Sequence, residues 1–112
     1  MDRRKELKEQ YKNRKVVGGI YRIINKENGR FYLQSTDDIQ ATHNWFRSCR
    51  TFGGCSLPPI QEDWKKFGID AFYVEEIDLL EKGELQTREE FTSDLKTLLE
   101  LWSEKLPKEN RY

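Results

Sequence analysis

Two tyrosines, Tyr21 and Tyr32, stand on either side of an Asn-Gly pair in the stretch GGIYRIINKENGRFYLQST, residues 18–36. A phenol has an unperturbed pKa near ~10, so it can take a proton from water at neutral pH only where neighbouring positive charge lowers that pKa. Tyrosine is also a frequent strand residue, with high β-propensity and a large ring to bury. The pair therefore belongs either to a chemical site or simply to a sheet.

The residues around the tyrosines predict a β-hairpin. β-Branched and aromatic residues fill 16–25 and 30–35, and Asn28-Gly29 between them is the strongest short-range hairpin signal. Gly18-Gly19 inside the first strand indicates a bulge or a close approach of the backbone. The other expected elements are a polar helix over 1–15, helices over 38–49, 59–68 and 88–106, and a third strand over 71–79.

The order of these elements, α-β-β-α-α-β-α, indicates the α+β class, with a small mixed sheet covered by helices. We expect two parts, the polar helix of 1–15 and a single domain over 16–112. In the last helix, a capping-box pattern formed by Thr87 and Glu90 precedes apolar residues at steps of three and four, which predicts one buried stripe. The stripe consists of Phe91, Leu95, Leu98, Trp102 and Leu106.

The composition fits one small domain, because charged and hydrophobic residues each make up 36% of the 112 residues. No apolar run reaches the ~20 residues of a membrane span, so we expect no membrane partner and a cytoplasmic location. The spacing of Cys49 and Cys55, without a second pair or a neighbouring histidine, does not match a zinc site.

Charge is distributed unevenly although the net charge is zero. Residues 1–35 carry ten Lys and Arg against four Asp and Glu, whereas 59–112 carry eight against fourteen. A basic first third can follow a phosphate backbone, and an acidic second half cannot. A dedicated nucleic-acid-binding domain usually has a basic isoelectric point, whereas the isoelectric point of this chain is near 6.6. The alternative interpretation is therefore that these charges are the ordinary solvent-exposed residues of helices.

Two short triplets carry a resemblance to a known family. Gly19-Ile20-Tyr21 is followed after ten residues by Tyr32-Leu33-Gln34, and the segment WKKFGIDAFYVEEIDLL, residues 64–80, fits the helix and strand that come next. This arrangement resembles the GIY-YIG nuclease family over about 17–106, although Leu33 and Gln34 replace the Ile and Gly of the second triplet.

The resemblance implies a three-stranded antiparallel sheet flanked by helices and a one-metal phosphodiesterase site. It implies that Tyr21 helps to deprotonate the attacking water and that Tyr32 positions the water and the phosphate. It also implies an Arg on the following helix, which neutralises the phosphate, and a Glu on a later helix, which holds a divalent ion such as Mg²⁺.

Two of these groups are missing from the matching positions. The expected arginine falls at or next to Thr42, and the nearest guanidinium, Arg47, is five residues further on, about 140° around a helix. His43 stands beside that position and could contact a phosphate if protonated. The expected metal-binding glutamate falls at Leu99, and its neighbour Glu100 points almost opposite to the buried stripe.

We therefore expect a GIY-YIG endonuclease-like domain with an incomplete catalytic site, which serves as a weak nucleic-acid-binding or interaction module. The alternatives are an active Mg²⁺-dependent DNA endonuclease with a rearranged site and a protein-interaction domain without a nucleic-acid role. Whether the chain is an enzyme stays open.

DNA or RNA is the expected partner, and no cofactor is expected unless the nuclease interpretation holds, which would require Mg²⁺ or Mn²⁺. The candidate catalytic residues are Tyr21, Tyr32 and His43, the candidate nucleic-acid contacts are Arg14, Lys15, Arg22 and Arg30, and no metal ligand is assigned.

Overall fold

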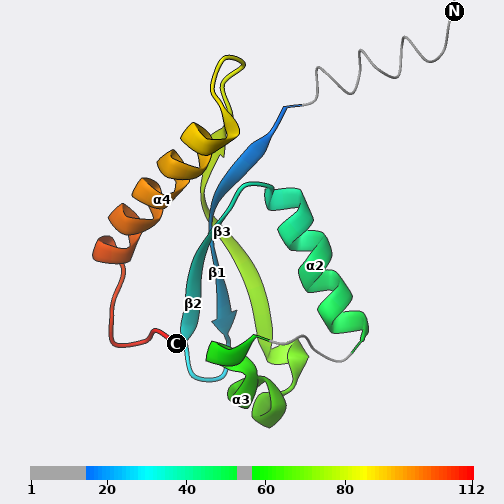
Figure 1. Cartoon of the computed structure of the whole chain (residues 1–112). Helices are drawn as coiled ribbons and strands as arrows, with labels where there is room; N and C mark the ends of the chain where they lie inside the picture. Colours follow the sequence, from blue (N-terminus) through cyan, green and yellow to red (C-terminus); the bar gives the residue numbers. More distant parts are fainter. Residues whose placement is uncertain (1–14, 53–56) are drawn as a thin grey trace, which may run out of the picture.

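The protein is described by a computed structural model, which covers residues 15–52 and 57–112. The elements follow the order β-β-α-α-β-α, so the fold class is α+β as predicted (Figure 1). The predicted order began with one more helix over 1–15. That segment lies outside the described residues except for Lys15, which precedes the first strand, so the observed order is shorter by this helix.

Three strands form one sheet, in the spatial order β2-β1-β3. β1 spans Val17–Asn25, β2 spans Phe31–Thr36 and β3 spans Phe72–Glu81. Both pairings are antiparallel, as the family resemblance implied, so the sheet is not mixed. β1 is thus the central strand and is hydrogen-bonded on both sides.

The hairpin between β1 and β2 has the predicted Asn-Gly turn. Ile20 lies opposite Ser35, and Gly29 adopts a φ of 73°, which residues with a Cβ rarely take. The Gly29 amide donates to the carbonyl of Asn25 at 2.8 Å and closes the loop. The turn chemistry therefore sets the register that places β2 beside β1.

The glycine pair of β1 lies where neighbouring backbone comes very close. A Cβ on Gly18 would lie 2.4 Å from the carbonyl oxygen of Thr36, and one on Gly19 would lie 2.2 Å from that of Asp78. On β3 the register skips Ile77, because Ile20 pairs with Asp78 and Tyr21 with Glu76. Of the two features that the glycine pair indicated, the close approach of the backbone is found at Gly18 and Gly19 themselves. The bulge is found on the partner strand β3.

Within residues 15–52 and 57–112, three α-helices and one short 3-10 turn accompany the sheet. α2 begins where Asp38 accepts a hydrogen bond from the amide of Ala41, and α4 begins with the predicted capping box of Thr87 and Glu90. No helix within the described residues combines the length and apolarity needed to cross a membrane. The bounds are Ile39–Thr51 for α2, Pro58–Phe67 for α3, Ile69–Ala71 for the 3-10 turn η1 and Arg88–Lys105 for α4.

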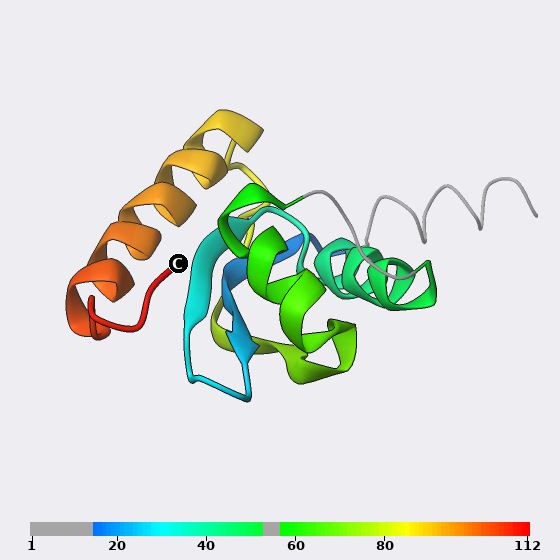
Figure 2. The ribbon, with the colours of Figure 1, turned by 90° about the horizontal axis from the view of Figure 1, so that it is seen from below.

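Helices cover the sheet from two sides. α4 lies along β2 and β1 on one side, whereas α2 and α3 lie on the other (Figures 1 and 2). On the α4 side, Phe91 and Leu95 of the predicted stripe are buried, Trp102 is half-buried, and its indole N–H donates to Asp78 at 3.1 Å. The α2 and α3 side holds the main apolar cluster, which includes Tyr21, Ile23, Phe46, Ile60, Trp64 and Phe72.

Arg111 and Tyr112, the last two residues, contact elements on both sides of the sheet. The Tyr112 hydroxyl donates to Asp63 of α3 at 2.7 Å and accepts from the buried Asn25 amide at 3.1 Å. Arg111 forms a parallel bridge with Phe31, and its guanidinium donates to the carbonyl of Leu106 beyond the end of α4. The C-terminal residues therefore link α3, the hairpin and α4.

The burial of α4 predicts different costs for truncations on its two faces. Phe91 is 1% exposed and Leu101 is 50% exposed, so Phe91→Ala should cost ~3–5 kcal/mol of unfolding free energy and Leu101→Ala less than ~1 kcal/mol. Urea unfolding followed by tryptophan fluorescence measures both. Equal losses in the two variants would contradict the packing of α4 against the sheet.

Candidate functional site

The two tyrosines of the triplets meet on the α2 side of the sheet. Tyr21 on β1 lies opposite Gln34 and Tyr32 on β2 lies opposite Ile23, so that strand alternation turns both phenols to the same face. They line an open hollow of about 290 Å³, which we call the tyrosine hollow. Its other described lining residues are Ala41, Thr42, Trp45 and Leu57.

Tyr21 is a buried phenol with a raised pKa. The residue is 8% exposed, and burial together with the neighbouring Tyr32 raises the pKa of Tyr21 to about 12. A general base needs the opposite shift, because its pKa must approach the working pH. Among the described lining residues no cation is present to lower this pKa. The surroundings of Tyr21 therefore favour a neutral hydroxyl.

Tyr32 is engaged by the residue that replaces the glycine of the second triplet. The Gln34 amide nitrogen donates to the Tyr32 hydroxyl at 3.1 Å, and the Gln34 amide oxygen accepts from the backbone N–H of Ser35 at 3.0 Å. A glycine here would leave the phenol open to a ligand. The replacement of glycine by Gln34 is visible in the sequence, whereas the contact of Gln34 with Tyr32 was not predicted.

Thr42 occupies the side of α2 that faces the tyrosine hollow, where the resemblance implies an arginine. It is 8% exposed, and its hydroxyl lies 2.9 Å from the Thr36 hydroxyl and 3.2 Å from the Asp38 carbonyl. These contacts hold the start of α2 against the end of β2. A short neutral side chain therefore stands where phosphodiesterase chemistry needs a charged one.

His43 and Arg47 lie on another side of α2. The His43 Nε2 is 2.6 Å from a carboxylate oxygen of Glu76 on β3, and both His43 and Arg47 line a separate hollow between α2 and β3. The described lining of the tyrosine hollow includes neither. Glu76, which the sequence analysis did not single out, lies opposite Tyr21 in the β1–β3 ladder. The pairing of β1 with β3, which are far apart in the sequence, is what brings Glu76 close to His43.

The position expected for a metal-binding glutamate lies on α4. Leu99 is half-buried there and Glu100 is exposed, and neither belongs to the described lining of the tyrosine hollow. Mg²⁺ is held in proteins mainly by carboxylate oxygens and water, whereas the described lining offers two phenols and one hydroxyl. No cluster of three His, Cys, Asp or Glu within 15–52 and 57–112 could hold a metal ion. The described residues of the hollow do not fit the ion that the resemblance implies.

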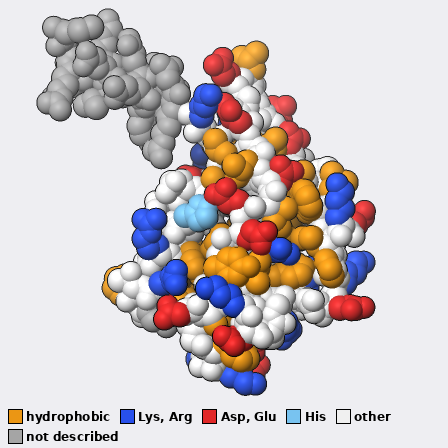
Figure 3. Space-filling model, turned by 180° about the vertical axis from the view of Figure 1, so that it is seen from behind, with side chains coloured by type: hydrophobic (Ala, Val, Ile, Leu, Met, Phe, Trp, Pro, Cys, Tyr) orange, Lys and Arg blue, Asp and Glu red, His pale blue; other side chains and the backbone are white. Residues whose placement is uncertain are grey.

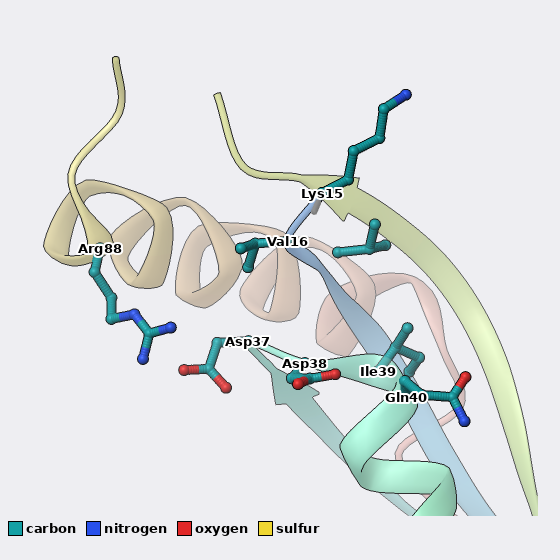
Figure 4. Close-up of a pocket in the computed structure, with 8 residues that line it drawn as sticks. Lys15, Val16, Asp37, Asp38, Ile39, Gln40 and Arg88 are labelled. Atoms are coloured by element: carbon teal, nitrogen blue, oxygen red, sulfur yellow. The ribbon is translucent and has the colours of Figure 1, made fainter. Parts of the chain in front are cut away.

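A larger hollow of about 600 Å³ opens between the starts of β1, α2 and α4. Asp37, Asp38 and Arg88 line it, and the side chains of Asp37 and Arg88 point toward one another across it (Figure 4). The two aspartates that follow β2 thus face this hollow. Neither contributes a carboxylate to the described lining of the tyrosine hollow.

The candidate nucleic-acid contacts lie apart from one another and pair with acids. Lys15 lies 3.8 Å from Glu81, Arg22 binds Glu75 at 2.9 Å, and Arg30 lies 3.7 Å from Asp63. Arg22 follows Tyr21 in β1 and so points to the α4 side. Arg14 lies outside the described residues. The structure does not bring these cations to the tyrosine hollow, and their role as contacts stays a prediction.

No protein-family model matches this chain, and no curated protein matches it. Among solved structures, the chain is similar to the catalytic domain of the homing endonuclease I-TevI, with 22% sequence identity and a TM-score of 0.59. The match covers 85% of this chain and 95% of that domain. The chain therefore has the fold of the GIY-YIG nucleases, the family that its two tyrosine triplets resemble.

Proposed function

We propose that this domain keeps the nuclease fold as a weak nucleic-acid-binding module and does not hydrolyse phosphodiesters. One observation carries the proposal. The described residues of the tyrosine hollow bring neither a guanidinium nor a carboxylate to the two phenols.

Phosphodiester hydrolysis makes three demands on such a site. Water is a poor nucleophile and must lose a proton, and the negative charge of the transition state needs a guanidinium and a metal ion. Thr42 provides no positive charge, and the pKa of Tyr21 is shifted away from that of a useful base. The loss of one electrostatic stabiliser commonly lowers the rate of catalysis by ~10²–10³. Here two are replaced, because Thr42 stands at the position of the expected arginine and Leu99 at that of the expected metal-binding glutamate.

Nucleic acid is the favoured ligand for two reasons. The fold is that of a nuclease catalytic domain, and the first 35 residues carry ten Lys and Arg against four Asp and Glu. The ion pairs of Lys15, Arg22 and Arg30 reduce the charge available to phosphates. Binding should therefore be weak and should fall steeply with salt, because each phosphate contact releases counterions.

Nicking of supercoiled plasmid in Mg²⁺ or Mn²⁺ tests the absence of cleavage. The wild-type protein should cleave no more than Tyr21→Phe or His43→Ala prepared in the same way, because none of the three combines a base with a charged stabiliser in the hollow. Cleavage that Tyr21→Phe or His43→Ala abolishes would establish a rearranged active site and refute the proposal. Cleavage that survives equally in both variants comes from a contaminant.

The raised pKa of Tyr21 predicts a pH-dependent contribution to stability. In the unfolded chain the phenol titrates near ~10, and in the folded protein at about 12, so the contribution is complete below pH ~10 and is lost as pH rises toward 12. The difference in unfolding free energy between wild type and Tyr21→Phe should therefore shrink by up to ~2 kcal/mol over this range. A difference that widens with pH would show a lowered pKa, as an activated phenol requires.

A further inference from the structure

Part of the outer strand β3 stays uncovered on the side of the sheet that faces α4. Phe72 and Val74 pack into the apolar cluster on the α2 side, so strand alternation turns Tyr73 to the α4 side. α4 packs mainly over β2 and β1, and Tyr73 is 38% exposed. Seen from behind, hydrophobic side chains gather between the single histidine of the chain and the side where α4 lies (Figure 3). We call this region the open face, and it comprises Arg22, Lys26, Tyr73, Glu75, Trp102 and Lys105.

Two aromatic rings border the open face. Tyr73 lies opposite Ile24 in the β1–β3 ladder. Asp78, which accepts a hydrogen bond from the Trp102 indole at 3.1 Å, lies opposite Ile20. The two rings are therefore attached about four residues apart along β1, which is ~13 Å at the rise of a β-strand. Rings at this separation can contact two different bases of one strand.

A lysine ammonium lies over each ring. The Lys26 Nζ is 5.5 Å from the centre of the Tyr73 ring, and the Lys105 Nζ is 5.1 Å from the centre of the Trp102 ring. Both lysines are exposed, and neither has an ion-pair partner within the described part of the chain. The flexible stem of a lysine lets its ammonium turn toward a phosphate while the ring receives a base.

The acids of β3 on this side are already engaged. Arg22 donates to a carboxylate oxygen of Glu75 at 2.9 Å, and Asp78 accepts from Trp102. The exposed acids two residues away from Trp102 lie about 160° around α4 from it, and these are Glu100 and Glu104. The charge beside the two rings is therefore positive, which suits a polyanion.

We propose that the open face binds single-stranded nucleic acid. Bases stack on Tyr73 and Trp102, and phosphates bind the ammonium groups of Lys26 and Lys105. Exposed rings beside cations are the combination that proteins use to hold unpaired bases together with their phosphates. In a duplex the bases are already stacked on one another and gain nothing from the rings. The inference rests on the proposed function and places its ligand on the opposite side of the sheet from the tyrosine hollow.

Tryptophan fluorescence during titration with oligo(dT) at low salt tests where the ligand lies. A base stacked on Trp102 quenches its emission, so the wild-type signal should fall and Trp102→Phe should remove most of that fall. Trp45→Phe is the matched control, because Trp45 lines the tyrosine hollow. This control should keep the decrease.

Fluorescence anisotropy with a labelled oligo(dT) measures the contribution of each group. Lys26→Glu with Lys105→Glu should weaken binding by ~10-fold or more and lower the slope of log affinity against log salt by ~1.4, because two contacts to a single strand are lost. Tyr73→Ala should weaken binding by about fivefold or more, whereas Tyr73→Phe keeps the ring and should stay within about twofold of the wild type. Arg47→Glu with Arg50→Glu makes the same change of net charge at exposed positions of α2 and should have little effect.

Three results would overturn the inference, and they separate it from the proposed function. Absence of binding by the wild type to single-stranded and duplex DNA and RNA at low salt removes both. Quenching that Trp45→Phe abolishes and Trp102→Phe leaves, or binding that the α2 pair weakens as much as the lysine pair, leaves the function standing and moves the surface elsewhere. Tighter binding of duplex that is insensitive to Tyr73→Ala removes the single-stranded ligand. If the charge-reversed lysine pair is unfolded by circular dichroism, Lys26→Gln with Lys105→Gln replaces it.

Discussion

The central strand β1 is the constraint on which both surfaces of this domain depend. It is hydrogen-bonded to a strand on each side and has helices on each face, so successive side chains must alternate between the two layers. Tyr21 therefore enters the α2 side, and its neighbour Arg22 turns to the α4 side and binds Glu75. A shift of register by one residue would exchange the two, but the close backbone contacts at Gly18 and Gly19 hold the register in place.

The periodicity of α2 places Thr42 and the nearest guanidinium on different sides of the helix. Thr42 turns inward and links α2 to β2, whereas His43 and Arg47 turn toward β3. Arg47, the guanidinium that follows the position expected for a phosphate-binding arginine, lies about 140° around the helix from it. The backbone of a nuclease fold is thus retained while positive charge stands on a different side of the same helix. Because fold and site chemistry are separable, a shared fold does not by itself carry the activity.

Features set by neighbouring residues could be predicted from the sequence. The Asn28-Gly29 turn, the capping box at Thr87 and the burial of Phe91 and Leu95 on α4 are confirmed, because turn type, cap and helical period are local properties, whereas Leu98, Trp102 and Leu106 of the predicted stripe are only half-buried. The predicted hairpin pairs β1 with β2, and the observed register then places Tyr21 and Tyr32 on one face of the sheet. Contacts between residues far apart in the chain could not be predicted, since no local pattern encodes them. These are the bulge at Ile77, the pairing of His43 with Glu76, and the contacts of Tyr112 with Asn25 and Asp63.

We propose that the tyrosine hollow does not bind the metal ion of a phosphodiesterase site. Paramagnetic Mn²⁺ broadens amide signals close to where it binds, so a substoichiometric titration followed by nuclear magnetic resonance tests the claim directly. We expect no selective broadening at Tyr21, Tyr32 or Thr42, because the described residues around them offer no carboxylate. Selective loss of these signals at low Mn²⁺, reversed by excess Mg²⁺, would contradict it.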